Sequence, residues 1–112
     1  MIKIYESNGV PELTEQVITD VFKLHGFKQV SSSDAFIYNY TKIEPLLNNA
    51  KVDLTVYFDD SNDTCSISVT TPDIDDFAYL SDYFSTRNEI IKWINNDYYV
   101  AINEMKERKD TE

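Results

Sequence analysis

The fold is decided by residues 51–71, which read KVDLTVYFDDSNDTCSISVTT. Apolar and polar residues alternate on both sides of a central polar run. A period of two is typical of strands that bury one face. If Val56 lies opposite Ile67, every apolar side chain falls on the same side of the pair. The stretch therefore predicts a β-hairpin with a dry face, a wet face and a loop at residues 59–64.

The residues before this hairpin predict one helix and two further strands. Apolar residues at helical spacing follow Pro11, which suits a first helical turn, and Gly26 supplies a C-terminal stop. We expect a helix over residues 11–25. Short runs at 27–30 and 35–42 predict strands, and the alternation does not decide which face of the second one is buried.

The residues after the hairpin predict helices. The sequence Thr71-Pro72-Asp73 has the residue types of a helix start, so a short helix is expected there. Its inward side chains would be Ile74, Phe77, Leu80 and Phe84. Thr86 and Glu89 match a capping box, and apolar residues at helical spacing extend the last helix to about Arg108.

Together these elements predict an α+β fold. We expect a two-layer sandwich in which an antiparallel meander of three or four strands carries helices on one face, in the order α-β-β-β-β-α-α. The length of 112 residues fits a single domain, residues 1–112. Residues 1–6 alternate weakly and predict a short strand or an extended arm, and the charged residues 106–112 are expected to fray.

The net charge of −10 is concentrated in one third of the chain. Residues 53–89 contain nine acids and one base, for a formal charge of −8. Such a surface repels phosphate backbones and anionic membranes and favours basic partners. The distribution predicts a basic protein partner, with no direct binding of nucleic acid or membrane.

Six of these acids have no local structural explanation. Asp73 and Glu89 suit helix starts, and Asp53 belongs to the wet face of a strand. The six that remain are Asp59, Asp60, Asp63, Asp75, Asp76 and Asp82. Tyr79 and Tyr83 are interleaved with them, and tyrosine is enriched at protein interfaces. We predict that these eight residues bind a partner; the alternative is that the acids fill turns and keep the protein soluble.

The sequence gives little support for a metal site or a catalytic site. Asp59 and Asp63 are spaced as in a calcium loop, but Thr64 stands where that loop requires glycine. Cys65 and His25 are the only residues of their kind, which argues against zinc and against a paired nucleophile and base. We expect no enzyme, no metal and no cofactor. One cysteine and no apolar signal segment are consistent with a reducing cytoplasm.

In size, acidity and residue usage the chain resembles small acidic phage proteins that disable host nucleases, the anti-CRISPR proteins among them. Its preference for Ile, Asn, Tyr and Lys over Gly and Ala matches A/T-rich coding, as in some phages and bacteria. The resemblance implies a basic nuclease or CRISPR effector as partner, inhibited in its nucleic-acid channel inside a bacterial host cell. Two alternatives stay open: an immunity protein for a nuclease toxin, and a homo-oligomeric interaction module that uses the Tyr and Phe surface.

Overall fold

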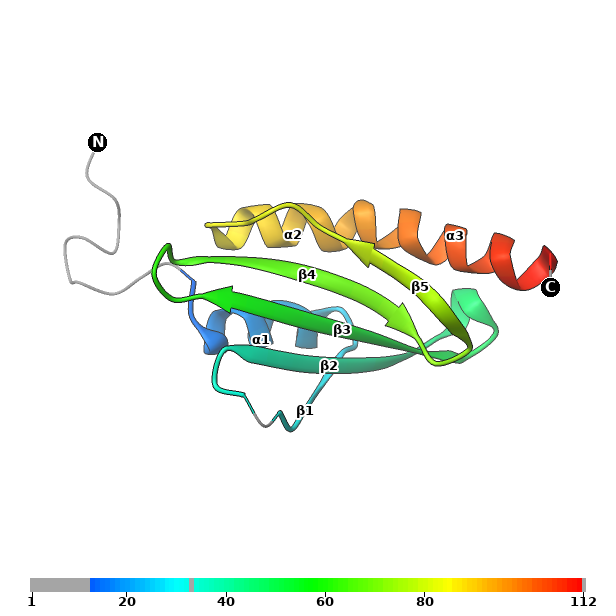
Figure 1. Cartoon of the computed structure of the whole chain (residues 1–112), viewed down its shortest axis with the longest axis horizontal. Helices are drawn as coiled ribbons and strands as arrows, with labels where there is room; N and C mark the ends of the chain where they lie inside the picture. Colours follow the sequence, from blue (N-terminus) through cyan, green and yellow to red (C-terminus); the bar gives the residue numbers. More distant parts are fainter. Residues whose placement is uncertain (1–12, 33, 112) are drawn as a thin grey trace.

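The computed structural model describes residues 13–32 and 34–111, so the arm predicted at residues 1–6 lies outside it. The elements are α1 (Glu15–Leu24), β1 (Lys28–Val30), β2 (Ile37–Glu44), the 3-10 turn η2 (Pro45–Leu47), β3 (Ala50–Asp59), β4 (Thr64–Thr71), β5 (Ile74–Leu80), α2 (Arg87–Asn95) and α3 (Asp97–Thr111). The strands form one antiparallel sheet in chain order, and the helices cover one of its faces (Figure 1). The predicted α+β sandwich is confirmed, with five strands in place of three or four.

The hairpin of β3 and β4 has the predicted register. Val56 pairs with Ile67, and the last pair before the loop is Asp59 with Thr64. The apolar side chains on the dry face of both strands are buried under the helices, except that of Phe58 next to the loop, which is half-buried. The opposite face carries Ser, Thr and Asp side chains together with Tyr57, and none of the described helices covers it (Figure 1).

The tyrosines of strand β2 point toward the helices. This is therefore the buried face of the strand, which the sequence pattern did not decide. Tyr40 is almost fully buried, and its ring packs edge-on against Phe22 of α1, with 4.9 Å between the two ring centroids. Its hydroxyl lies 2.8 Å from the hydroxyl of Thr19, so the buried polar group is satisfied. Burial raises the pKa of Tyr40 to about 12. These contacts fix α1 on the sheet.

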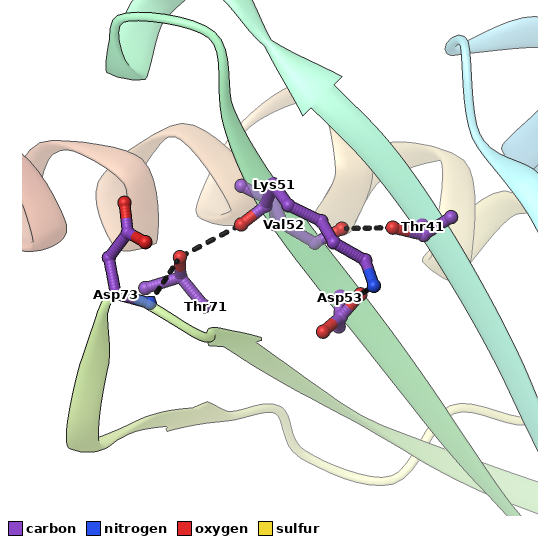
Figure 2. A network of polar contacts seen from close by, with 6 residues as sticks. All are labelled: Thr41, Lys51, Val52, Asp53, Thr71 and Asp73. Atoms are coloured by element: carbon purple, nitrogen blue, oxygen red, sulfur yellow. Dashed lines mark hydrogen bonds and ion pairs between the residues drawn. The ribbon is translucent and has the colours of Figure 1, made fainter.

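The short helix predicted after Thr71 is wrong, because this segment is the edge strand β5. Figure 2 shows the reason: the hydroxyl of Thr71 accepts a hydrogen bond from the amide of Asp73 and donates one to the carbonyl of Lys51 on β3. A threonine that accepts from an amide two residues later forms a turn as readily as a helix cap. The carboxylate of Asp73 does not cap a helix; it pairs with Lys109 of α3 at 3.0 Å.

A bulge in β5 explains why its sequence resembles a helix. From Ile74 to Tyr79 the strand advances five residues, while its partner β4 retreats only two, from Thr71 to Val69. The extra residues shift the inward side chains away from a strict period of two. Leu80, predicted to face inward, points away from the helices and is 71% exposed.

A helix starts after the N-cap Thr86, as predicted. It is interrupted at Asn96, so that two helices, α2 and α3, take the place of one. Thr86 and Glu89 form the capping box: the Glu89 amide donates to the Thr86 hydroxyl, and the Thr86 amide donates to the Glu89 carboxylate. Asn96 then adopts a non-helical conformation that ends α2. The following helix, α3, runs to Thr111, past the predicted end near Arg108. The helix before the sheet is also shorter than predicted, since Thr14 caps α1 and helical structure begins at Glu15.

A buried carboxylate joins the sheet to helix α3. Glu44, at the end of β2, is 2% exposed and accepts hydrogen bonds from the Tyr98 hydroxyl (2.8 Å) and the Leu46 amide (3.0 Å). The Lys42 ammonium lies 3.4 Å away. Burial by itself would raise the pKa of Glu44, but the hydrogen bonds and the charge of Lys42 outweigh it and hold the pKa below its usual value. Glu44 is therefore ionised in the folded protein at neutral pH.

Replacing Glu44 with alanine should destabilise the fold by about 3 kcal/mol or more, because the Tyr98 hydroxyl and Lys42 would both lose their partner. Tyr98→Phe should cost less, about 1–2 kcal/mol, since it removes one hydrogen bond. Urea unfolding at pH 7 measures both, with the exposed Glu107→Ala on α3 as control. Equal stability of Glu44→Ala and the control would contradict this role.

The same carboxylate should make stability depend on pH. Because the folded pKa of Glu44 is lowered, its contribution is complete above the ordinary pKa of 4.5 and is lost as pH falls through the lower folded value. Unfolding curves of the wild-type protein and Glu44→Gln, measured between pH 7 and the acid range, should converge as the pH falls. A constant difference at every pH would contradict the assignment.

Candidate protein-binding site

The β3–β4 loop and the segment after β5 meet at one end of the sheet. The Cys65 amide donates to the Phe84 carbonyl at 2.9 Å, and the Phe84 amide donates back to Cys65 at 2.7 Å. Two residues further in, Ser81 bonds to Ile67 through both its amide and its hydroxyl. These bonds hold Asp82 beside the first residues of β4. We call Asp59, Asp60, Asp63 and Asp82 the loop-end acids.

The loop itself has a defined conformation. The carboxylate of Asp59 accepts hydrogen bonds from the Ser61 hydroxyl (2.7 Å), the Ser61 amide (3.0 Å) and the Asn62 side-chain amide (2.8 Å). These bonds keep the pKa of Asp59 below its usual value. Asp63 has a φ of 51°, in the left-handed region that aspartate and asparagine tolerate better than most residues. The turn therefore fixes the Asp59 carboxylate and the backbone that carries Asp60 and Asp63.

The two remaining predicted acids lie elsewhere. Asp75 and Asp76 are exposed at the start of β5, next to the β4–β5 turn. That turn is at the opposite end of the sheet from the β3–β4 loop (Figure 1). The length of β4, from Thr64 to Thr71, puts roughly 20–25 Å between the two groups. The structure brings together four of the six predicted acids and separates the other two.

The distribution of ion pairs also distinguishes the two ends. Three ion pairs join described side chains: Lys42 with Glu44, Lys51 with Asp53, and Lys109 with Asp73. All three lie toward the end of the sheet that holds the β4–β5 turn, and none includes a loop-end acid. Lysines near the β4–β5 turn thus offset part of the acidic charge there.

The two predicted tyrosines face different ways. Tyr79 packs against the core on the helix side, where burial and the nearby Asp97 and Glu104 raise its pKa. It is unsuited to hold a partner on the open face. Tyr83 is 72% exposed and lies next to Asp82. Of the predicted pair, Tyr83 joins the loop-end acids.

A hollow of about 470 Å³ opens beside these acids. It is lined by Tyr57, Phe58, Asp59, Ser66, Leu80 and Tyr83. The Tyr57 side chain is 46% exposed and that of Leu80 is 71% exposed. We call this feature the tyrosine hollow. Tyr57 lies on the predicted wet face of the hairpin but is not among the predicted site residues, and Leu80 was missed because it was expected to face inward from a helix after Thr71.

The single cysteine and the single histidine have structural roles. Cys65 is buried on the dry face of β4, and burial raises the pKa of its thiol to about 12, so it is not a nucleophile at neutral pH. One ring nitrogen of His25 lies 3.0 Å from the Val21 carbonyl, and the other lies 3.1 Å from the Asn95 side-chain oxygen. These contacts link the end of α1 to the end of α2.

A second hollow, of about 510 Å³, adjoins α1, β1 and the start of β2. Its polar groups bond to one another. The Gln29 side-chain nitrogen donates to the Glu15 carboxylate at 2.7 Å, and the Thr19 hydroxyl donates to the Gln29 side-chain oxygen at 3.4 Å. This chain of bonds continues to Tyr40 and holds α1 against the sheet. The polar groups of this hollow therefore serve the fold.

Within residues 13–32 and 34–111, no three His, Cys, Asp or Glu side chains gather so as to hold a metal ion. None of the helices described is both long and apolar enough to cross a membrane. A scan against models of protein families gave no match, and comparisons with curated proteins and with solved structures gave no significant match.

Proposed function

We propose that this chain is a small acidic protein that binds a basic nucleic-acid-binding protein, such as a nuclease or a CRISPR effector, and inhibits it by occupying its nucleic-acid site. The loop-end acids form the centre of the contact. The observation that carries this proposal is the gathering of four carboxylates from two separate segments at one end of the sheet, outside the three ion pairs of the described side chains.

Charge and rigidity both suit the loop-end acids to a nucleic-acid-binding groove. A groove that binds a phosphate backbone presents Lys and Arg side chains, and carboxylates held at fixed positions compete for the same cations. The Asp59 turn and the bonds between residues 65–67 and 81–84 supply that rigidity. A preorganised acidic surface loses little entropy on binding, associates quickly and releases its partner more easily as salt rises.

The direct test is capture from a bacterial lysate with the immobilised chain, at about 0.05 M and about 0.5 M salt. We expect a nucleic-acid-binding protein to be retained at low salt and to be displaced by excess duplex DNA. The captured protein, once purified, should lose its nuclease or DNA-binding activity when the chain is added. A partner that binds equally well in the presence of DNA would contradict occupation of the nucleic-acid site.

Two matched variants locate the contact. Asp60→Asn, Asp63→Asn and Asp82→Asn together remove three loop-end charges, and Asp59 is kept because its carboxylate forms the turn. The control combines Asp75→Asn, Asp76→Asn and Glu107→Gln, which changes the net charge by the same amount elsewhere. The loop-end variant should bind the partner at least about ten-fold more weakly, while the control binds nearly as the wild type does. Equal losses in both variants would show that net charge alone matters.

The loop-end variant should keep its fold. Carboxylates gathered at one end repel one another, so their removal should leave the melting temperature unchanged or raise it at low salt. Asparagine also suits the left-handed backbone of Asp63. Thermal melts at two salt concentrations measure this. A fall of several degrees would indicate that these acids hold the loop, and the binding result would then have to be read as a loss of structure.

A further inference from the structure

The open face of the sheet changes character at the corner beside the loop-end acids. Over its centre the face is more polar: the shallow region there is lined by Asn39, Lys51, Asp53, Thr55 and Thr70, together with Val30, Tyr40 and Leu54. At the corner, Tyr57 comes from β3, Leu80 from the end of β5, and Tyr83 from the segment that follows. Three large exposed side chains that border one hollow differ from singly scattered apolar residues, which are normal on protein surfaces.

The chain segments that line the tyrosine hollow are acidic, and the nearest base along the chain is Arg87. Residues 57–66 contain three aspartates and no base, and residues 80–86 contain one aspartate and no base. Asp59 lines the hollow itself, and Asp82 adjoins Tyr83 in the chain. A ligand for this site must therefore combine positive charge with a surface that packs on tyrosine rings.

Arginine meets both requirements better than lysine does. Its guanidinium group is planar, stacks on aromatic rings and bonds to carboxylates with two parallel N–H groups, whereas the lysine ammonium is a compact and strongly hydrated charge. A second copy of this chain would bring four more aspartates against the four already present, which like-charge repulsion opposes. The complementary occupant is thus an arginine on a basic partner.

We propose that the tyrosine hollow is a docking site for an arginine side chain of the basic partner, stacked on Tyr57 and Tyr83 and paired with Asp59 or Asp82. This inference rests on the proposed function and adds to it the residue that the partner contributes. The rings supply a preference for arginine, and the loop-end acids supply the general attraction for positive charge.

The test uses two fluorescent peptides of equal length and charge, hexa-arginine and hexa-lysine, titrated with the full chain in an anisotropy assay. The arginine peptide should bind more tightly. Tyr83→Ala should weaken it by about three-fold or more and leave the lysine peptide nearly unchanged, as expected for one lost cation–π contact. Tyr57→Thr, which keeps a strand-forming residue on β3, should do the same, and Tyr99→Ala on α3 serves as the control.

Each outcome separates this inference from the proposed function. Equal affinity for the two peptides, or an arginine preference that survives both tyrosine variants, overturns the arginine site. If the loop-end charge variant abolishes partner binding but the tyrosine variants do not weaken it, the result supports the proposed function and contradicts the arginine site. Sedimentation that shows a dimer abolished by Tyr83→Ala would assign the hollow to a second copy and would also overturn the inference.

Discussion

The dry face of the β3–β4 hairpin is the constraint on which the rest of the structure depends. Strict alternation over both strands leaves one register that buries all the apolar side chains, and a slip by one residue would expose them. Once that face lies under the helices, the polar and acidic residues between and beside the strands have only the open face and the ends of the sheet left to occupy. The position of the β3–β4 loop, and with it three loop-end acids, follows from the register.

The two ends of the sheet then acquire different electrostatics. Near the β4–β5 turn, lysines of β2, β3 and α3 lie beside carboxylates, one of which, Glu44, is buried and joins the sheet to α3. At the loop end, the turn built on Asp59 fixes the backbone that carries Asp60 and Asp63, and the bonds of residues 81–84 to β4 add Asp82. The described ion pairs thus offset acidic charge near the β4–β5 turn, whereas none of them includes a loop-end acid.

How much the sequence predicts depends on how unambiguous each pattern is. The hairpin register and the capping box of α2 were predicted because period two and the Thr86–Glu89 pair each have one physical interpretation. Strand β5 was missed because Thr71 forms a turn with the atoms that would cap a helix, and a bulge moves its apolar residues toward helical spacing. That error placed Asp75 and Asp76 with the loop-end acids and turned Leu80 inward. A period of two counted from Ile74 also turns Leu80 inward; only the bulge between Ile74 and Tyr79 puts Leu80 on the open face.

The central claim is that this end of the sheet is a preformed surface for a basic protein. Its most direct measurement is a titration of the isotope-labelled chain with the hexa-arginine peptide, followed residue by residue through the amide NMR signals. If the loop-end acids bind the peptide, the shifted signals should cluster in residues 57–66 and 80–84, and the shifts should become smaller as salt is added. Shifts centred on Asp75 and Asp76, or spread evenly over all exposed acids, would contradict it.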